Sequence, residues 1–419
     1  MTEGGEPEPA ASLRRRLGTR LLRRAHRGLD AVSARRSSAG APTRGLALTG
    51  TVWTGGDSEP EAGVVVFDGA GIVRAIHLGE RPSLPHELLV LGGVNHWVVP
   101  GIVDAHVHLG FDPGLDEGGS GTVSGLRTGL VGVRDLGAPL RLAGIWQTGR
   151  HKPPRDTPFV AAAGPVLTAP GGYPAQSWGA SGYAEFLTGP AQARSLVQRL
   201  AADGVDLIKI ALEPGSVGWP VPTPDVVAAV VQTAHNLGLS VVAHALTQDM
   251  VRRAVEAGVD ELAHTPTERL SEALIERIAA SGLSITSTLQ TFFSGGAGRE
   301  AAANATDLVA AGVRIHYGTD LGNTGTHPGV DPRELDRLAD AGLGRLGALR
   351  AATEWSSAAA GIRSRSGLIR VGQPATAVLL PSSPLTEPGA WRTPSAICCD
   401  GRLTVVTAPL RSPAERPTT

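Results

Sequence analysis

The chain has 419 residues, of which 42% are hydrophobic and 18% are charged, and its formal net charge is −1. A chain of this length buries a sizeable core and forms one large domain with an appendage, or two domains. The near-neutral charge gives no electrostatic footprint for nucleic acid. The two cysteines are the neighbours Cys398 and Cys399, which excludes a disulfide framework and fits a reducing compartment. No apolar stretch is long enough to span a membrane and no hydrophobic signal core follows the first residues, so we expect a cytoplasmic protein.

The first 45 residues are strongly basic. They contain ten arginines and four acidic residues, a net charge of +6, which leaves −7 for the rest of the chain. Leucines at helical spacing predict a basic amphipathic helix over 12–32. Because chain ends are commonly poorly ordered, we expect residues 1–45 to form a flexible extension. The alternative is an arm that docks on a partner or a membrane surface.

Short β-like runs occupy residues 46–97 and return over 366–410. Among them are LALTGTVW, GVVVFDG and, near the other end, GLIRVGQPATAVLLP. Glycine and proline separate these runs at intervals typical of antiparallel sheet. Two such flanks around a long middle predict one small β-sandwich-like domain built from both parts of the chain, followed by a tail over 411–419.

The middle of the chain, residues 98–365, alternates apolar strand-like runs with helix-like stretches. Helical segments such as PDVVAAVVQTAHNLG and QDMVRRAVEAG end in a glycine, where a helix C-cap is expected. Eight such βα units over this length predict a (β/α)8 TIM-like barrel. A doubly wound open sheet is the alternative, and the missing glycine-rich phosphate loop counts against its dinucleotide-binding version.

The strongest local signal is the pair His106 and His108 in the run VPGIVDAHVHLG. Alternation along a strand places both side chains on one face. Two imidazoles on one face chelate a single metal ion at about 2.0–2.1 Å per Zn–N bond. A short motif is frequent by chance, so the pair alone does not decide between a metal site and coincidence.

Four further polar residues lie in or at the ends of other predicted strands, namely Lys209, His244, His264 and Asp320. Barrel enzymes assemble their sites at the carboxyl ends of the strands, which open onto one face. For Asp320 the alternative is a helix N-cap, and for His244 and His264 it is a hydrogen-bonded core histidine. An unpaired lysine in a buried strand is costly, so Lys209 requires a partner or a shifted pKa.

The motifs DAHVH, IKI, AHA, AHT and GTD occur in that order, and with them the sequence resembles the amidohydrolase superfamily, most closely its binuclear prolidase-like and imidazolonepropionase-like branch. The resemblance covers residues 46–408. It implies that His106, His108 and Asp320 hold one metal ion and that His244 and His264 hold a second.

The resemblance also implies that carbon dioxide carboxylates Lys209, and that the resulting carbamate bridges both ions. An ammonium group cannot bind a cation, whereas a carbamate offers anionic oxygens. Asp320 is then the residue that accepts the proton of a metal-activated hydroxide and passes it to the leaving nitrogen. The mixed nitrogen and oxygen ligands suit two zinc ions, although manganese, cobalt or iron also bind such sets.

Mononuclear, deaminase-type relatives place a glutamate three residues after the strand-5 histidine, and this chain has Thr247 there. Prolidase-like relatives commonly have a histidine after strand 3 where this chain has Tyr173, and a tyrosine in the loop after strand 4 that this chain lacks. The bond-breaking residues therefore match the family, and the residues around the substrate differ. An ordinary Xaa-Pro dipeptidase is in doubt.

Four side chains of predicted loops above the barrel mouth are candidate substrate-binding residues: Tyr173, Trp178, Trp219 and His327. Aromatic residues make up only 4% of the chain, so three in two such loops indicate a pocket for a bulky or apolar substrate. Loop packing is the alternative interpretation.

The leading prediction is a binuclear metal-dependent hydrolase that cleaves an amide bond in a small-molecule, peptide or peptide-derived substrate. A narrower version removes a segment from a modified precursor, as an amidohydrolase does in bottromycin-type natural product pathways. Lactonase- or phosphotriesterase-type ester hydrolysis is a further alternative. A barrel without catalysis that serves only as an interaction protein ranks low, because all six expected ligand positions are present. Homo-oligomerisation stays open.

Overall fold

A computed structural model describes residues 45–80, 82–111, 128–148, 158–323, 325–363 and 365–406 of the chain. Apart from Gly45, the basic extension predicted over 1–45 lies outside the described residues, and so does the tail predicted over 411–419.

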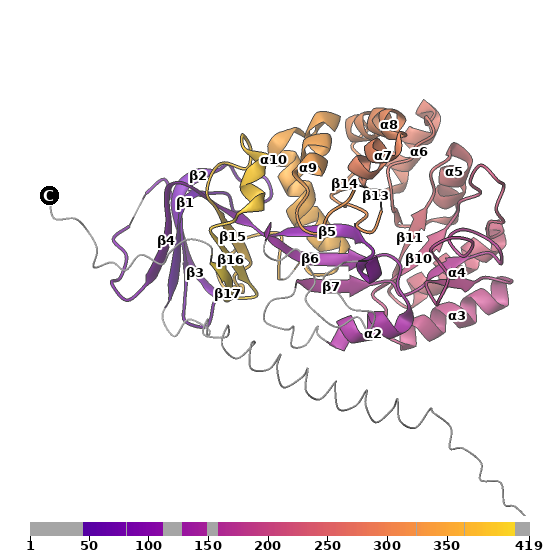
Figure 1. Cartoon of the computed structure of the whole chain (residues 1–419), viewed down its shortest axis with the longest axis horizontal. Coiled ribbons are helices and arrows are strands. Elements are labelled where there is room, and N and C mark those ends of the chain that lie inside the picture. Colours follow the sequence, from indigo (N-terminus) through magenta and orange to yellow (C-terminus); the bar gives the residue numbers. More distant parts are fainter. Residues whose placement is uncertain are drawn as a thin grey trace, which may run out of the picture.

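The middle of the chain forms a barrel of parallel strands surrounded by helices (Figure 1). Its strands pair in parallel in chain order, as the βα alternation predicts. They are β5 (Ile102–Val107), β6 (Leu130–Asp135), β7 (Phe159–Ala162), β8 (Val166–Thr168), β10 (Leu207–Ala211), β11 (Ser240–His244), β12 (Glu261–Leu262), β13 (Ser284–Thr286) and β14 (Ile315–His316).

The third barrel strand is interrupted. Its first segment, β7, pairs with β6, and its second segment, β8, pairs with β10. Gly164, between the two segments, has φ +70°, a conformation that side-chain-bearing residues rarely adopt. A short strand, β9 (Ala184–Phe186), pairs with the edge of β8 that lies opposite β10.

The barrel closes between its first strand and the residues that follow its last strand. Three backbone hydrogen bonds of 2.8–3.0 Å join these segments, from Ala105 N to Tyr317 O, from His108 N to Leu321 O and from Asp320 N to His106 O. This closure places Asp320 beside the predicted histidine pair.

The helices lie on the outside of the barrel (Figure 1). They are α2 (Leu140–Thr148), α3 (Pro190–Ala202), α4 (Pro224–Asn236), α5 (Gln248–Ala257), α6 (Glu272–Ser281), α7 (Leu289–Gly295), α8 (Gly298–Ala310), α9 (Pro332–Leu338), α10 (Gly344–Arg350) and α11 (Ser356–Ala359). In α4, Val226, Val230 and Ala234 recur every four residues and are buried against the barrel. Burial of each valine contributes about 1.5–3 kcal/mol.

Gly258 ends α5 in the left-handed conformation, which confirms the expected C-cap.

Both flanks of the barrel sequence join in one mixed seven-stranded sheet of order β17-β16-β15-β4-β1-β2-β3, at the left of Figure 1. Its strands are β1 (Leu46–Val52), β2 (Glu61–Phe67), β3 (Val73–Leu78), β4 (Leu89–Pro100), β15 (Ala377–Leu380), β16 (Ala396–Cys399) and β17 (Arg402–Val406). The two flanks meet where β15 pairs antiparallel with β4. The predicted composite β domain is thereby confirmed, and the limits assigned to it, 46–97 with 366–410, stay predictions, as does 98–365 for the barrel.

The sheet folds over onto its own core. The turn between β2 and β3 meets the turn between β16 and β17 so closely that a Cβ on Gly71 would lie 1.7 Å from Gly401 O. Leu48, Phe67 and Leu379 are among the buried side chains of the hydrophobic core of this sheet. Because β4 ends at Pro100 and β5 begins at Ile102, this core anchors the strand that carries His106.

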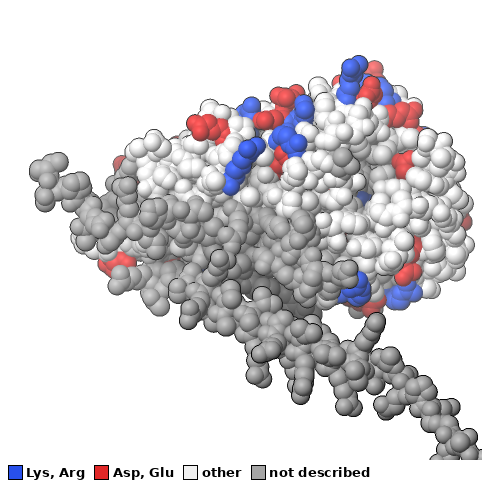
Figure 2. All heavy atoms as spheres, in the orientation of Figure 1, with Lys and Arg blue, Asp and Glu red and all other residues white. Residues whose placement is uncertain are grey.

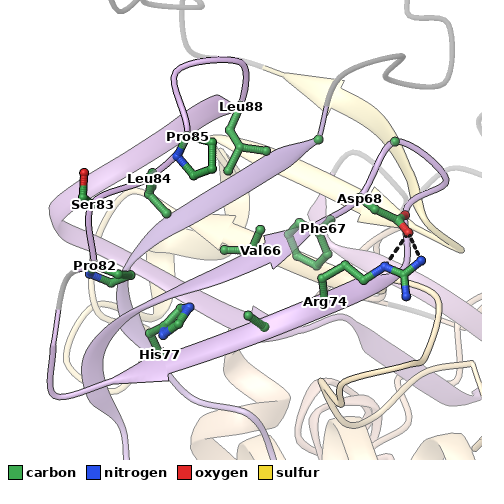
Figure 3. Close-up of a pocket in the computed structure, with 13 residues that line it drawn as sticks. Val66, Phe67, Asp68, Arg74, His77, Pro82, Ser83, Leu84, Pro85 and Leu88 are labelled. Carbon is green, nitrogen blue, oxygen red and sulfur yellow. Dashed lines mark hydrogen bonds and ion pairs between the residues drawn. The ribbon is translucent and has the colours of Figure 1, made fainter.

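One hollow of about 510 Å³ lies on this β domain, outside the barrel (Figure 3). Its wall is largely apolar, with Phe67 and Leu88 among its lining residues, and an ion pair of 2.7 Å joins Arg74 to Asp68 at one side. It contains no group of metal-ligating side chains among the described residues, so the chemistry has to be sought in the barrel.

On the face shown in Figure 2, acidic and basic side chains lie next to one another along the edge of the described part of the chain. Arg252, for example, pairs with both Asp249 and Glu256 on α5. Within the described ranges, no helix is long and apolar enough to cross a membrane.

Candidate metal centre

The structure brings the six predicted metal-site residues together at the carboxyl end of the barrel strands. His106 belongs to β5 and His108 follows it directly, Lys209 belongs to β10, and His244 is the last residue of β11. His264 follows β12 and Asp320 follows β14. All six side chains are buried.

His106, His108 and Asp320 point their ligand atoms at one another. Asp320 Oδ1 lies 3.3 Å from His106 Nε2 and 3.5 Å from His108 Nε2, and the two Nε2 atoms are 3.4 Å apart. In the described part of the chain, this is the only set of three His, Cys, Asp or Glu side chains whose ligand atoms all lie within 4.8 Å. Such a set of two nitrogens and one oxygen fits a divalent cation.

His244 and His264 form the second half of the cluster. Their ring centroids are 4.7 Å apart, and the ring of His264 lies 4.6 Å from that of His106. His264 Nδ1 is also 3.9 Å from Asp320 Oδ2. The four histidines and the aspartate therefore form one continuous group.

Burial keeps all four imidazoles neutral, the form that binds metal. The pKa of His108 falls to about 3, because burial penalises the cation and Lys209 repels it. Burial likewise lowers the pKa of His244, and lowers the pKa values of His106 and His264 well below the ordinary value.

Lys209 lies within this group and is 3% exposed. Burial lowers the pKa of its ammonium, although the charge of Asp320 opposes the shift. Burial also raises the pKa of Asp320, which the charge of Lys209 opposes in turn. The environment thus favours a neutral amine on Lys209.

Asp104 is a buried residue of β5 that the sequence reasoning did not single out. Its carboxyl accepts hydrogen bonds from His106 N at 3.1 Å and from Thr319 Oγ1 at 2.6 Å. Burial raises its pKa to about 7. It ties the strand of the first histidines to the residue before Asp320, and its position on that strand, two residues before His106, was the available signal.

Aromatic rings cover the cluster, as predicted for the loops above the barrel. Trp178 lies 4.7 Å from the ring of His108, and Tyr173 lies 4.9 Å from that of His244. Trp178 Nε1 donates a hydrogen bond to Tyr173 Oη at 3.0 Å, and Trp219 stacks on Tyr173 at 5.7 Å. Phe111, which the sequence reasoning missed, meets Trp178 edge to face at 6.0 Å.

The loops after β8 and β10 pack against each other to hold these rings. A Cβ on Gly172 would lie 2.4 Å from Pro220 O, so only glycine fits next to Tyr173. Burial raises the pKa of Tyr173 to about 12, which keeps its phenol neutral.

Two predicted positions stand apart from the cluster. His327 is exposed, and within the described residues no hydrogen bond, ion pair or ring contact joins it to the cluster, so its role in substrate binding stays a prediction. Thr247 caps the amino end of α5 by accepting a hydrogen bond from Met250 N at 3.4 Å, which is a structural role.

Glu213, in the loop after β10, is the main site residue that the sequence reasoning missed. Its Oε2 lies 3.5 Å from His244 Nε2, and its Oε1 accepts a hydrogen bond from Gly215 N at 2.6 Å. Burial favours a higher pKa for this carboxyl, but His244 and the Gly215 N–H outweigh burial and hold the pKa below its ordinary value. Glu213 stands four residues after Lys209 and two after the end of β10, and that position at a strand end was the available signal.

The cluster passes a simple chemical test for a metal site. Asp320 Oδ1, beside the Nε2 atoms of His106 and His108, is buried without a hydrogen-bond partner. Native interiors rarely leave such an atom unsatisfied unless a ligand binds it. The residues present therefore fit a cation.

Comparison with known proteins identifies the family of the chain. Residues 159–404 match the model of the amidohydrolase family. Uncharacterized proteins of Mycobacterium tuberculosis and Mycobacterium bovis are 30% identical over 280 residues, which cover 60% of this chain and 70% of each relative.

Solved structures share the fold at lower identity. A Xaa-Pro dipeptidase with bound methionine in its active site superposes with a TM-score of 0.73 at 20% identity, covering 86% of this chain and 99% of that one. The A. niger ochratoxinase gives a TM-score of 0.71 at 18% identity, covering 88% and 99%. The family match spans more than half of the chain, and the predicted fold is confirmed. The chain belongs to the amidohydrolase family and is a hydrolytic enzyme.

Proposed function

We propose that this chain cleaves an amide bond in a small-molecule or peptide-derived substrate with two divalent metal ions, for which zinc suits the donor set. His106, His108 and Asp320 would hold the first ion, and His244 and His264 the second. The observation that carries the proposal is the convergence of two Nε2 atoms and Oδ1 of Asp320 within 3.5 Å of one another. The fold shared with a Xaa-Pro dipeptidase supports a peptide-like substrate.

Lys209 would join the two sites as a carbamate. A neutral amine is the form that reacts with carbon dioxide, and burial of Lys209 favours that form. Carboxylation also removes the cost of an unpaired buried lysine. The carbamate would supply two anionic oxygens between the two histidine groups.

When bound, the two cations polarise the scissile carbonyl and make an attacking water more acidic. Asp320 would accept the proton from that water at a carboxylate oxygen and then donate it to the leaving nitrogen. Burial raises the pKa of Asp320, which makes this carboxylate a stronger base than an exposed one.

Tyr173, Trp178 and Phe111 would bind an apolar or aromatic part of the substrate. Their rings cover His244 and His108 and would shield the reacting atoms from bulk solvent. Because Tyr173 stands where prolidase-like relatives commonly have a histidine, we expect a preference that differs from that of an Xaa-Pro dipeptidase.

A mass-spectrometric screen of the metal-loaded enzyme tests the proposal. The panel contains N-acyl amino acids and short linear and cyclised peptides, each offered in an aromatic and an aliphatic form, with lactones and phosphotriesters beside them. We expect hydrolysis of amides, fastest for the aromatic forms, with rates about 10²–10⁴ times lower for the Asp320→Asn variant. Turnover of the lactones or phosphotriesters alone would contradict the proposed amide hydrolysis and indicate an ester hydrolase. Cleavage of cyclised peptides alone would favour segment removal from a modified precursor.

A further inference from the structure

Three of the four clustered histidines are held through Nδ1. His106 Nδ1 lies 2.8 Å from Ala263 O, and His108 Nδ1 lies 3.2 Å from Gly137 O. His264 Nδ1 lies 2.9 Å from the hydroxyl of Thr288. A carbonyl oxygen accepts only a proton, so His106 and His108 carry their hydrogen on Nδ1 and present the Nε2 lone pair.

His244 is held in the opposite sense. Its Nε2 lies 3.5 Å from a carboxylate oxygen, Glu213 Oε2. Both atoms are buried, and within the described residues neither has a hydrogen-bond partner. Tyr173 covers the same imidazole at a centroid distance of 4.9 Å.

The loop after β10 fixes the Glu213 carboxylate in this place. Gly215 N donates to Oε1 at 2.6 Å, which leaves Oε2 for His244. Gly215 has φ +55°, and a Cβ there would lie 2.9 Å from the ring of Trp219. Replacement of this glycine would therefore displace both the backbone donor and the indole.

We propose that Glu213 is a positioning residue for the second metal site: it accepts a hydrogen bond from the Nε2–H of His244 and thereby frees the Nδ1 lone pair for the cation. The inference rests on the proposed function of the cluster. Carboxylates that accept the outer N–H of a metal-binding histidine fix its tautomer and ring orientation.

The geometry favours this role over direct metal binding by Glu213. Among the described residues, only His106, His108 and Asp320 bring their ligand atoms within 4.8 Å of one another, so Glu213 does not form such a set with His244 and His264. Oε1 also accepts a hydrogen bond from Gly215 N, and Oε2 lies against a ring nitrogen of His244, so both oxygens already face protein nitrogens.

Metal binding by the Glu213→Gln variant tests the role. The amide keeps an oxygen in only one of the two carboxylate positions, so its NH2 group faces either Gly215 N–H or His244 Nε2–H as donor against donor. We expect the second equivalent of Zn²⁺ to bind about 10–100-fold more weakly in chelator competition, with the first equivalent unchanged. The matched control is Glu185→Gln, which removes a half-exposed carboxylate paired with Arg199 on the surface.

The cobalt-substituted enzyme gives a second readout, because the d–d absorption of the second Co²⁺ should change in Glu213→Gln and not in the control. Unchanged affinity and spectrum for the second ion would overturn the role of Glu213. A wild-type enzyme that binds no metal would instead overturn the proposed function.

The wild-type zinc enzyme gives a test that needs no variant. Long-range ¹⁵N–¹H correlation spectra of histidine-labelled protein show which ring nitrogen carries the hydrogen. We expect Nε2–H for His244 and Nδ1–H for His106 and His108. Protonation of His244 at Nδ1 would contradict the inference even if Glu213→Gln failed to fold.

Discussion

His106 Nε2 and Asp320 Oδ1 lie 3.3 Å apart at the seam where the first and last strands of the barrel meet. The backbones of the same two residues are joined by a 2.8 Å hydrogen bond from Asp320 N to His106 O. Asp320 adopts φ +56°, a conformation uncommon for residues with a side chain, which turns its carboxylate toward the histidines. The contact that closes the barrel therefore also brings these two predicted metal ligands together.

The Asp320→Asn substitution should remove the proton acceptor while keeping the size of the side chain. We expect kcat on the best substrate of the screen to fall by about 10²–10⁴, the usual contribution of a general acid–base group. Circular dichroism should stay unchanged. The control is Asp307→Asn, which removes a carboxylate that pairs with Arg269 on the surface, and equal activity of both variants would remove Asp320 from this role.

The Lys209→Met substitution should keep the volume of the buried side chain and remove the amine. If a carbamate on Lys209 joins the two metal sites, metal content measured by mass spectrometry should fall from about two ions per chain to about one. Wild-type enzyme in ¹³C-bicarbonate should show a carbamate resonance that the variant lacks. Two ions in the variant, or no resonance in the wild type, would contradict the bridge.

Removal of one partner from the buried ion pair between Arg134 and Glu261 should be strongly destabilising. The two side chains are 1% and 4% exposed, and Arg134 also donates from Nε to Ala105 O at 2.7 Å. Glu261→Gln leaves a buried guanidinium without its counter-charge, so we expect the free energy of unfolding to fall by about 3–5 kcal/mol. Urea denaturation measures the change.

The control for that experiment is Asp249→Asn on α5, which breaks exposed pairs with Arg252 and Arg253. Exposed pairs contribute about 0–1 kcal/mol. A similar small effect for Glu261→Gln would show that the barrel interior relaxes around the unpaired arginine.

Glu334 gives the stability a pH dependence. It is fully buried and accepts hydrogen bonds from Leu289 N and Gln290 N, and burial raises its pKa from 4.5 to about 7. Between these pH values the folded protein holds a proton that the unfolded chain has released. The free energy of unfolding therefore falls as the pH rises from about 4.5 to 7, by about 1.4 kcal/mol per unit of pKa difference.

The Glu334→Gln variant should lose this pH dependence. It should also be slightly less stable than the wild type at every pH, because one of its contacts with α7 is weaker. Urea unfolding at pH 5 and pH 8 measures how the free energy of unfolding of each protein changes with pH. Any release of metal affects both proteins equally and cancels from the difference between them. Parallel curves for the two proteins would show that Glu334 is ionised at both pH values.

The sequence predicted the architecture because strand and helix periodicities are local properties. It placed His106, Lys209 and His244 on different strands, and the rule that parallel strands share one carboxyl edge then brought them together. It did not predict the break at Gly164, because a strand interrupted by one left-handed glycine looks like two ordinary runs. It also extended the strands around His264 and Asp320 further than β12 and β14 reach.

Glu213 shows why the rest of the site escaped prediction. Its contact with His244 depends on the conformation of the loop after β10, which Gly215 and Trp219 set through close packing. Loop conformation follows from such contacts and leaves no period in the sequence. The sequence did indicate the aromatic cover, because Tyr173 and Trp178 stand out in a chain so poor in aromatic residues, but it could not separate them from His327.

The pairing of β4 with β15 sets an order for biosynthesis. As the ribosome makes the chain, β1 to β4 emerge first, and the free edge of β4 must wait for residues 377–380, which come after the whole barrel. Until then Val98 and Val99 present unpaired backbone next to the strand that leads to His106. A nascent or truncated chain that ends before β15 would therefore expose an aggregation-prone edge beside an otherwise complete set of catalytic side chains.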